Sequence, residues 1–110
     1  MSPTDAEPLV VLSTAPDAEV ASRLARLLVE GGHAACVGML PGLRSVYRWE
    51  GEVHEDAEVQ LVIKTVRGRF PALRDALLAA HPYDVPELLA LPVVDGGEAY
   101  LRWLGAAPEG

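Results

Sequence analysis

The segment from residue 81 to residue 87 combines an imidazole, a phenol and two carboxylates with two prolines. Its sequence is His81-Pro82-Tyr83-Asp84-Val85-Pro86-Glu87. Proline fixes φ and has no backbone N–H, so this segment can neither prolong a helix nor form a central strand. Rigid loops with titratable side chains often hold binding residues on a scaffold. By itself, the pattern is more typical of a helix end followed by an edge strand.

A second segment, Ser45-Val46-Tyr47-Arg48-Trp49-Glu50-Gly51, places two aromatic side chains next to a possible turn. If Glu50-Gly51 is a two-residue turn without a bulge, Tyr47 faces His54 and Trp49 faces Glu52. Alternate residues of a strand share one face of the sheet. The face that carries Tyr47 is therefore predicted to carry Ser45, Trp49, Glu58 and Lys64 as well.

The two segments together predict a ligand cleft. It would combine an aromatic wall with one cation, one carboxylate and the imidazole of the first segment, and could hold a small anionic or zwitterionic ligand. The predicted cleft residues are Tyr47, Trp49, Glu58, Lys64, His81 and Tyr83. The alternative is that Tyr47 and Trp49 pack against a neighbouring subunit, while Glu58 and Lys64 form a solvated ion pair of little energetic value.

The candidate metal ligands are His81 and Cys36. Imidazole and thiolate suit soft or borderline metals such as copper. His81 is the first choice because its loop is stiff, although it could equally be a cation at a helix C-terminus. Cys36, the single cysteine, is expected to be a small buried hydrophobe. We therefore expect no required cofactor and weak Cu(II) binding that falls as the pH drops through about 6.5, where imidazole ordinarily protonates.

Length and charge narrow the class of protein. The 110 residues form one domain over 1–110, and we expect residues 1–7 and 106–110 to be flexible. A net charge of −7 argues against nucleic acid and anionic membranes as partners. No apolar run is long enough to span a bilayer, and the acidic start of the chain does not resemble a signal peptide. We therefore expect a cytoplasmic protein.

Periodicity and breakers predict the order β-α-β-β-α-β followed by a C-terminal helix, which is an α+β, ferredoxin-like arrangement. Expected strands cover 9–14, 34–49, 52–66 and 87–94, and expected helices cover 17–30, 68–80 and 98–104. The predicted helix stripes are Val20, Leu24, Leu27 and Leu28 in the first helix, and Phe70, Leu73, Leu77 and Ala80 in the second. The core face of the hairpin is predicted to contain Val46, Val59, Leu61 and Ile63.

The predicted hairpin is too long for its domain. Both arms approach 15 residues, whereas most strands have five or six. A small domain cannot cover such a hairpin, so its tip must project. A projecting hairpin with aromatic side chains near its tip generally needs a partner chain.

Several short motifs follow one another between Val10 and Leu104. They are Ala34-Ala35-Cys36-Val37, Pro41-Gly42, residues 45–51, Glu58-Val59, Ile63-Lys64-Thr65, His81-Pro82-Tyr83 and Pro86-Glu87. In combination they resemble the CutA family of divalent-cation-tolerance proteins. The resemblance implies a tight homotrimer similar to PII signalling proteins, with the hairpins between subunits and the polar residues lining a cleft at the subunit boundary. It implies a link to tolerance of copper and other divalent metals, and no catalytic reaction.

Three functions remain open at this point. The first is a trimeric protein of divalent metal (copper) tolerance that binds metal ions weakly, and this is our prediction. The second is a PII-like small-ligand sensor without metal dependence, although no Gly-rich, Lys-containing phosphate loop is present for ATP. The third is a small trimeric enzyme that uses Lys64 and His81 in acid–base catalysis. Because nothing in the sequence positions a nucleophile or a second catalytic group, we predict that the protein is not an enzyme.

Overall fold

The computed structural model describes residues 3–107 and confirms the predicted order of strands and helices. The strands are β1 (Pro8–Ala15), β2 (Cys36–Trp49), β3 (Glu52–Val66) and β4 (Leu89–Pro92), and the α-helices are α1 (Ala18–Glu30), α2 (Phe70–Ala80) and α3 (Glu98–Ala106). Two short 3-10 helices, η1 (Pro3–Ala6) and η2 (Arg67–Arg69), precede β1 and α2. Along residues 3–107, no helix is long and apolar enough to cross a lipid bilayer.

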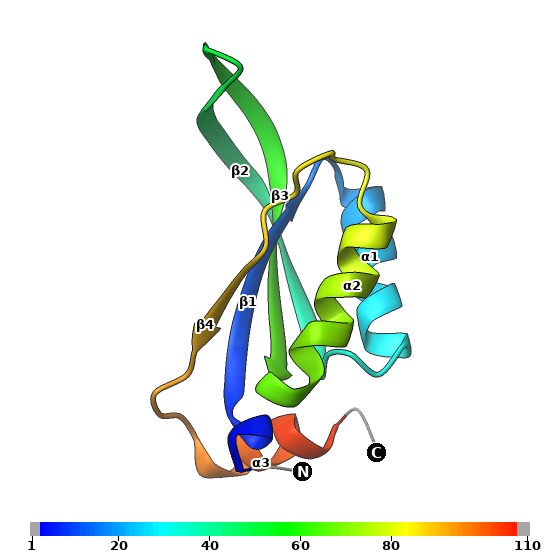
Figure 1. The fold of residues 1–110 in the computed structure, drawn as a ribbon, viewed down its shortest axis with the longest axis vertical. Coiled ribbons are helices and arrows are strands. Elements are labelled where there is room, and N and C mark those ends of the chain that lie inside the picture. The colour runs from blue at the N-terminus through cyan, green and yellow to red at the C-terminus, as the bar shows by residue number, and fades with distance from the viewer. Residues whose placement is uncertain (1–2, 108–110) are drawn as a thin grey trace.

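The four strands form one antiparallel sheet in the order β2-β3-β1-β4. Helices α1 and α2 lie together on one face of this sheet, whereas the far end of the β2–β3 hairpin extends beyond both helices (Figure 1). Helix α3 lies at the opposite end of the molecule from the hairpin tip, next to η1 (Figure 1). The result is an elongated domain of 44 × 26 × 23 Å.

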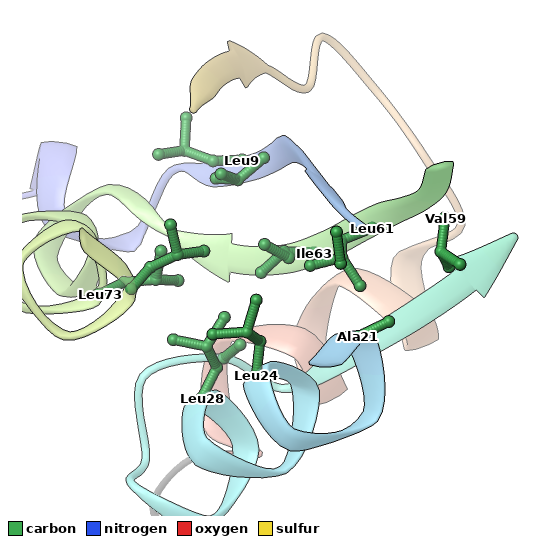
Figure 2. Close-up of a cluster of buried hydrophobic side chains, with 12 residues drawn as sticks. Leu9, Ala21, Leu24, Leu28, Val59, Leu61, Ile63 and Leu73 are labelled. Atoms are coloured by element: carbon green, nitrogen blue, oxygen red, sulfur yellow. The ribbon is translucent and has the colours of Figure 1, made fainter. Parts of the chain in front are cut away.

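The core lies between the two helices and the inner face of the sheet. Leu24 and Leu28 of α1 point toward Leu61 and Ile63 of β3, and all four side chains are fully buried (Figure 2). Leu73 and Leu77 of α2 complete this layer and are also fully buried. Burying a leucine or isoleucine side chain stabilises the fold by about 1.5–3 kcal/mol, so these six residues are a main source of stability.

Two predicted core positions are wrong. Leu27 is exposed because α1 turns Ala21 and Ala25 toward the sheet instead. Small side chains at those two positions allow the helix to approach the strands closely. Val46 is exposed because it lies in the projecting part of the hairpin, beyond the reach of either helix.

The largest differences between predicted and observed element boundaries are at α2 and β4. Helix α2 begins at Phe70 rather than Gly68, because Arg67–Arg69 forms a 3-10 turn. Strand β4 is only four residues long, since the proline-containing segment before it stays irregular. The chain before β1 is tied to η2, where Arg67 N–H donates to the Glu7 carbonyl at 2.8 Å. The expected flexibility of residues 1–2 and 108–110 concerns positions outside the described residues.

The hairpin register agrees with the prediction. Tyr47 pairs with His54 and Trp49 pairs with Glu52 across the Glu50-Gly51 turn. Both turn residues have positive φ, 50° and 81°, as a type I′ turn requires. A bulge interrupts the pairing lower on β2, between Leu40 and Leu43, where Gly42 has a φ of 89°.

The turn offers a direct test of backbone strain. Glu50 holds a left-handed conformation that asparagine adopts more readily. We expect Glu50→Asn to raise the free energy of unfolding by about 0.5 kcal/mol, measured by thermal unfolding at fixed protein concentration. As the converse control, Gly51→Ala should lower it by about 1 kcal/mol. No atom lies within 4 Å of the added methyl group, so this loss would come from the backbone alone. Equal stability of all three proteins would contradict the strained turn.

Candidate functional site

A cavity of about 410 Å³ lies between the projecting β2–β3 hairpin and the loop that follows α2. Strands β2 and β3 supply one wall, the C-terminal end of β1 supplies the floor, and the loop over 83–87 supplies the other wall. The lining residues are Thr14, Ser45, Tyr47, Trp49, Asp56, Glu58, Tyr83, Asp84, Val85 and Glu87. The cavity therefore brings together the two segments that stood out in the sequence.

His81 holds the loop against β1. It is 8% exposed, and its Nδ1 accepts a hydrogen bond from Tyr83 N–H at 3.1 Å. This leaves Nε2 protonated, so that it donates to the Thr14 carbonyl at 2.7 Å. A third bond, from the Ser13 hydroxyl to the Glu87 carbonyl at 2.8 Å, fixes the other end of the loop. The cavity wall is therefore set by hydrogen bonds to the β1 backbone, together with the two prolines of the loop.

Two tyrosine–carboxylate pairs line the cavity, one between the loop and β3 and one within the hairpin. Tyr83 donates its hydroxyl proton to Glu58 at 2.9 Å, and Tyr47 donates to Asp56. Burial of Tyr83, reinforced by the hydrogen bond to Glu58, raises the pKa of this phenol well above its usual range. The hydrogen bond to Asp56 is the main cause of a raised pKa at Tyr47. Both phenols therefore stay neutral and hold the two carboxylates in place.

The charge of the cavity differs from the sequence-based expectation. Four of its ten lining residues are acidic, namely Asp56, Glu58, Asp84 and Glu87, and none is a lysine or an arginine. Such a cavity repels anions. The electrostatics therefore favour a cationic group over the anionic ligand that the sequence suggested.

The structure brings together four of the six predicted cleft residues. Tyr47, Trp49, Glu58 and Tyr83 all line the cavity. Lys64 shares a face with Glu58, but six residues along a strand separate the two by about 20 Å, and Lys64 pairs with Cys36 at the other end of β3. His81 lies behind Tyr83, with their ring centroids 4.8 Å apart, and does not line the cavity itself.

The two candidate metal ligands lie apart. Both ring nitrogens of His81 are engaged in hydrogen bonds, so neither is free to coordinate a metal in this arrangement. Cys36 is half-buried rather than buried, and its sulfur lies 3.6 Å from the Tyr100 hydroxyl at the α3 end of the molecule. Among the described residues, no group of three or more His, Cys, Asp or Glu side chains is placed to hold a metal ion.

Several cavity residues are absent from the predicted set. Asp56 could have been found, because it alternates with Glu58 and directly faces Ser45 across the hairpin. Asp84 and Glu87 lie in segment 81–87, but only the residues with ring side chains, His81 and Tyr83, were predicted to line the cleft. Thr14 could not have been found by alternation within the hairpin, because it reaches the cavity through the pairing of β1 with β3.

The raised tyrosine pKa values predict that the tyrosines ionise at higher pH in the folded protein than in the unfolded protein. Tyr47, Tyr83 and Tyr100 all have raised pKa values, so the folded state holds these protons more tightly than the unfolded state. The resulting stability is fully present below about pH 10 and is lost as the pH rises through the folded-state values. We expect tyrosinate absorbance to appear at higher pH in the native protein than in guanidinium, and Tyr83→Phe to remove the latest step. Coincident native and denatured curves would contradict these hydrogen bonds.

Comparison with known proteins decides the family. The family model "CutA1 divalent ion tolerance protein" matches residues 9–107. The chain belongs to the CutA1 family. The divalent-cation tolerance protein CutA of Thermus thermophilus is 53% identical over 95 residues, which cover 86% of this chain and 92% of that protein. The resemblance noted in the sequence is thereby confirmed.

Solved CutA1 structures share the fold. The crystal structure of CutA1 from Oryza sativa has a TM-score of 0.90 and 44% identity, covering 94% of this chain and 95% of that one. The periplasmic divalent cation tolerance protein CutA of Archaeoglobus fulgidus has a TM-score of 0.88 and 33% identity, covering 92% and 98% of the two chains. CutA1 membership thus extends across the whole sheet and its helices, including the elements that form the cavity.

Proposed function

We propose that this protein acts in the tolerance of divalent metal ions, copper among them, as a non-enzymatic homotrimer that binds these ions weakly. The observation that carries the proposal is the CutA1 match over residues 9–107, together with a cavity that contains four carboxylates and no lysine or arginine. Carboxylate oxygens attract divalent cations and can supply ligands to them.

Weak binding is part of the proposal. Within residues 3–107, no preformed cluster of three ligands is available to a metal. A cation would therefore keep much of its hydration shell, or would take a further ligand from a neighbouring subunit. Because carboxylate, thiolate and imidazole ligands must be deprotonated, the affinity should fall as the pH is lowered.

Assembly into a trimer, with a ferredoxin-like subunit and a PII-like arrangement, is the second part of the proposal. The strand order β2-β3-β1-β4 with both crossover helices on one face supports this fold assignment. Large apolar side chains of the projecting hairpin are exposed, among them Val46, Trp49 and Val53, and a partner subunit would cover such a surface.

Location and partners follow from charge and composition. We propose a cytoplasmic protein without nucleic-acid or membrane partners, because the net charge is −7 and the single cysteine requires no oxidising compartment. The Archaeoglobus fulgidus relative is named as periplasmic. Immunoblotting of cell fractions would test the location, and recovery of the protein outside the cytoplasm would contradict this part of the proposal.

A small-ligand sensor without metal dependence is the alternative function. The cavity volume of about 410 Å³ supports it, because small-molecule sites commonly measure about 300–1,000 Å³. The effect of added metal on ligand binding distinguishes the two functions. A sensor would bind an organic ligand without any effect of added metal.

Calorimetry with Cu(II) and Zn(II) tests the metal proposal. We expect weak, saturable binding to the wild type that is reduced in Glu58→Gln and Asp56→Asn, which each remove one carboxylate from the cavity. The matched control is Glu55→Gln, because Glu55 lies on the opposite face of the hairpin and pairs with Arg44 at 2.8 Å. Equal binding by all four proteins would mean that the metal occupies nonspecific surface groups. No binding by any of them would contradict the proposed function.

A further inference from the structure

We propose that the cavity between the hairpin and the 83–87 loop binds a small protonated aliphatic amine, with a preference for a diamine. The inference goes beyond metal tolerance and does not depend on it. It rests on four features of the cavity, namely its volume, its charge, its aromatic wall and one unpaired hydroxyl group on its floor.

The volume of the cavity leaves room for an organic ligand. A cavity of about 410 Å³ is far larger than a metal ion needs, and it lies in the range of small-molecule sites. A chain of a few carbon atoms fits inside it with its charged ends near the acidic walls.

The charge indicates a cation, and a dication more than a monocation. Asp56, Glu58, Asp84 and Glu87 come from both walls of the cavity, and no basic residue lines it. The phenols of Tyr47 and Tyr83 hydrogen-bond to one oxygen each of Asp56 and Glu58. The remaining oxygens of these two carboxylates can accept bonds from an ammonium group. The acidic groups are spread over the cavity rather than gathered into one metal cluster, an arrangement that suits two separated ammonium groups.

The aromatic wall favours an organic cation. Trp49, Tyr47 and Tyr83 line the same cavity as the carboxylates. A cation near a tryptophan or tyrosine face is attracted by the electron density of the ring, and an alkyl chain packs on the same surface. Because the two phenols remain neutral, their rings keep this role over the physiological pH range.

The side chain of Thr14 supplies an independent indication of a ligand. Thr14 is 4% exposed and lines the floor of the cavity. Its backbone carbonyl accepts a bond from His81, but within residues 3–107 its hydroxyl group has no hydrogen-bond partner. This hydroxyl group is accessible from the cavity, because no fully buried side-chain oxygen of the described residues lacks a partner. An ammonium N–H donated to this oxygen would satisfy it.

A series of three probes with the same four-carbon chain tests the proposal. The probes are 1,4-diaminobutane, 1-aminobutane and butan-1-ol, which carry two, one and no positive charges at neutral pH. Trp49 serves as the fluorescent reporter in a Trp103→Phe background, because the chain has only two tryptophans and Trp103 lies on α3, away from the cavity. We expect saturable binding of one diamine per chain, with affinity at least about tenfold higher for the diamine than for the alcohol, a difference of about 1.4 kcal/mol.

Three variants in the same background locate the site. Thr14→Val removes the unpaired hydroxyl group, and Glu58→Gln removes one charge from the wall, so both should weaken diamine binding several-fold. Glu55→Gln is the matched control and should bind the diamine as the parent does, because Glu55 lies on the other face of the same strand.

Three outcomes would overturn the proposal. They are equal affinity for the alcohol and the diamine, an equal loss of binding in Glu55→Gln and Glu58→Gln, and no saturable binding of any probe. Cu(II) calorimetry on the same samples keeps the two proposals distinct. Metal binding without amine binding would overturn this inference alone, whereas amine binding without metal binding would overturn metal tolerance and leave this inference intact.

Discussion

Replacement of His81 by alanine is expected to lower the free energy of unfolding by about 2–4 kcal/mol. The imidazole is 8% exposed and joins the Thr14 carbonyl to the Tyr83 N–H. Alanine would leave both backbone groups without their partner and would also create a hole behind Tyr83. Each unsatisfied buried group costs about 1–3 kcal/mol, which is why this substitution should exceed most surface changes.

Urea denaturation at fixed protein concentration measures this effect. His33→Ala is the control, because its half-buried imidazole makes no hydrogen bond within residues 3–107. We expect this control to change the stability by less than about 1 kcal/mol. A loss in His81→Ala no larger than that of the control would show that the loop is held by its prolines rather than by His81.

Val46→Asp is expected to convert a trimer into a monomer. Val46 and Val53 are 66% and 63% exposed and lie on the same face of the projecting hairpin. If the hairpins pack between subunits, this face is buried in the assembly. An unpaired carboxylate there would cost several kcal/mol in each of the three subunits.

Light scattering coupled to size exclusion gives the result directly. The wild type should have three times the chain mass of 11.7 kDa, and Val46→Asp should have the mass of one chain. The variant should also melt at a lower temperature, because subunit association stabilises the native state by mass action. Val29→Asp on the outer surface of α1 is the control and should remain trimeric. A monomeric wild type would refute the trimer, and a trimeric Val46→Asp would place the interface elsewhere.

Sequence periodicity predicted the elements well because the core is made by local repeats. The leucines of α1 and α2 and the alternating residues of β3 have helical and strand spacing respectively, and they meet in one layer. The error at Leu27 has a simple cause. Periodicity identifies large apolar residues, whereas α1 contacts the sheet through the small residues Ala21 and Ala25.

The site was less predictable because alternation gives the face of a residue but not its distance from another. Glu58 and Lys64 do share a face, yet only Glu58 reaches the cavity. Thr14 enters the site through the β1–β3 pairing, which no local pattern encodes. His81 was predicted to bind a ligand or a metal because imidazole often does so. Its observed hydrogen bonds instead position the loop.

The bulge in β2 adds one residue to this arm of the hairpin. The face on which each later side chain lies therefore depends on whether the number of residues in the arm is odd or even. From Leu40 to Leu43 the strand advances three residues, while its partner advances only two, from Gln60 to Glu58. Deleting Gly42 would remove the offset. Either Tyr47 would turn away from the cavity, or Val37 would leave the core against which it packs. Insertion or deletion of two residues would keep both sets of side chains on their present faces. The length of this segment can therefore change only by an even number of residues.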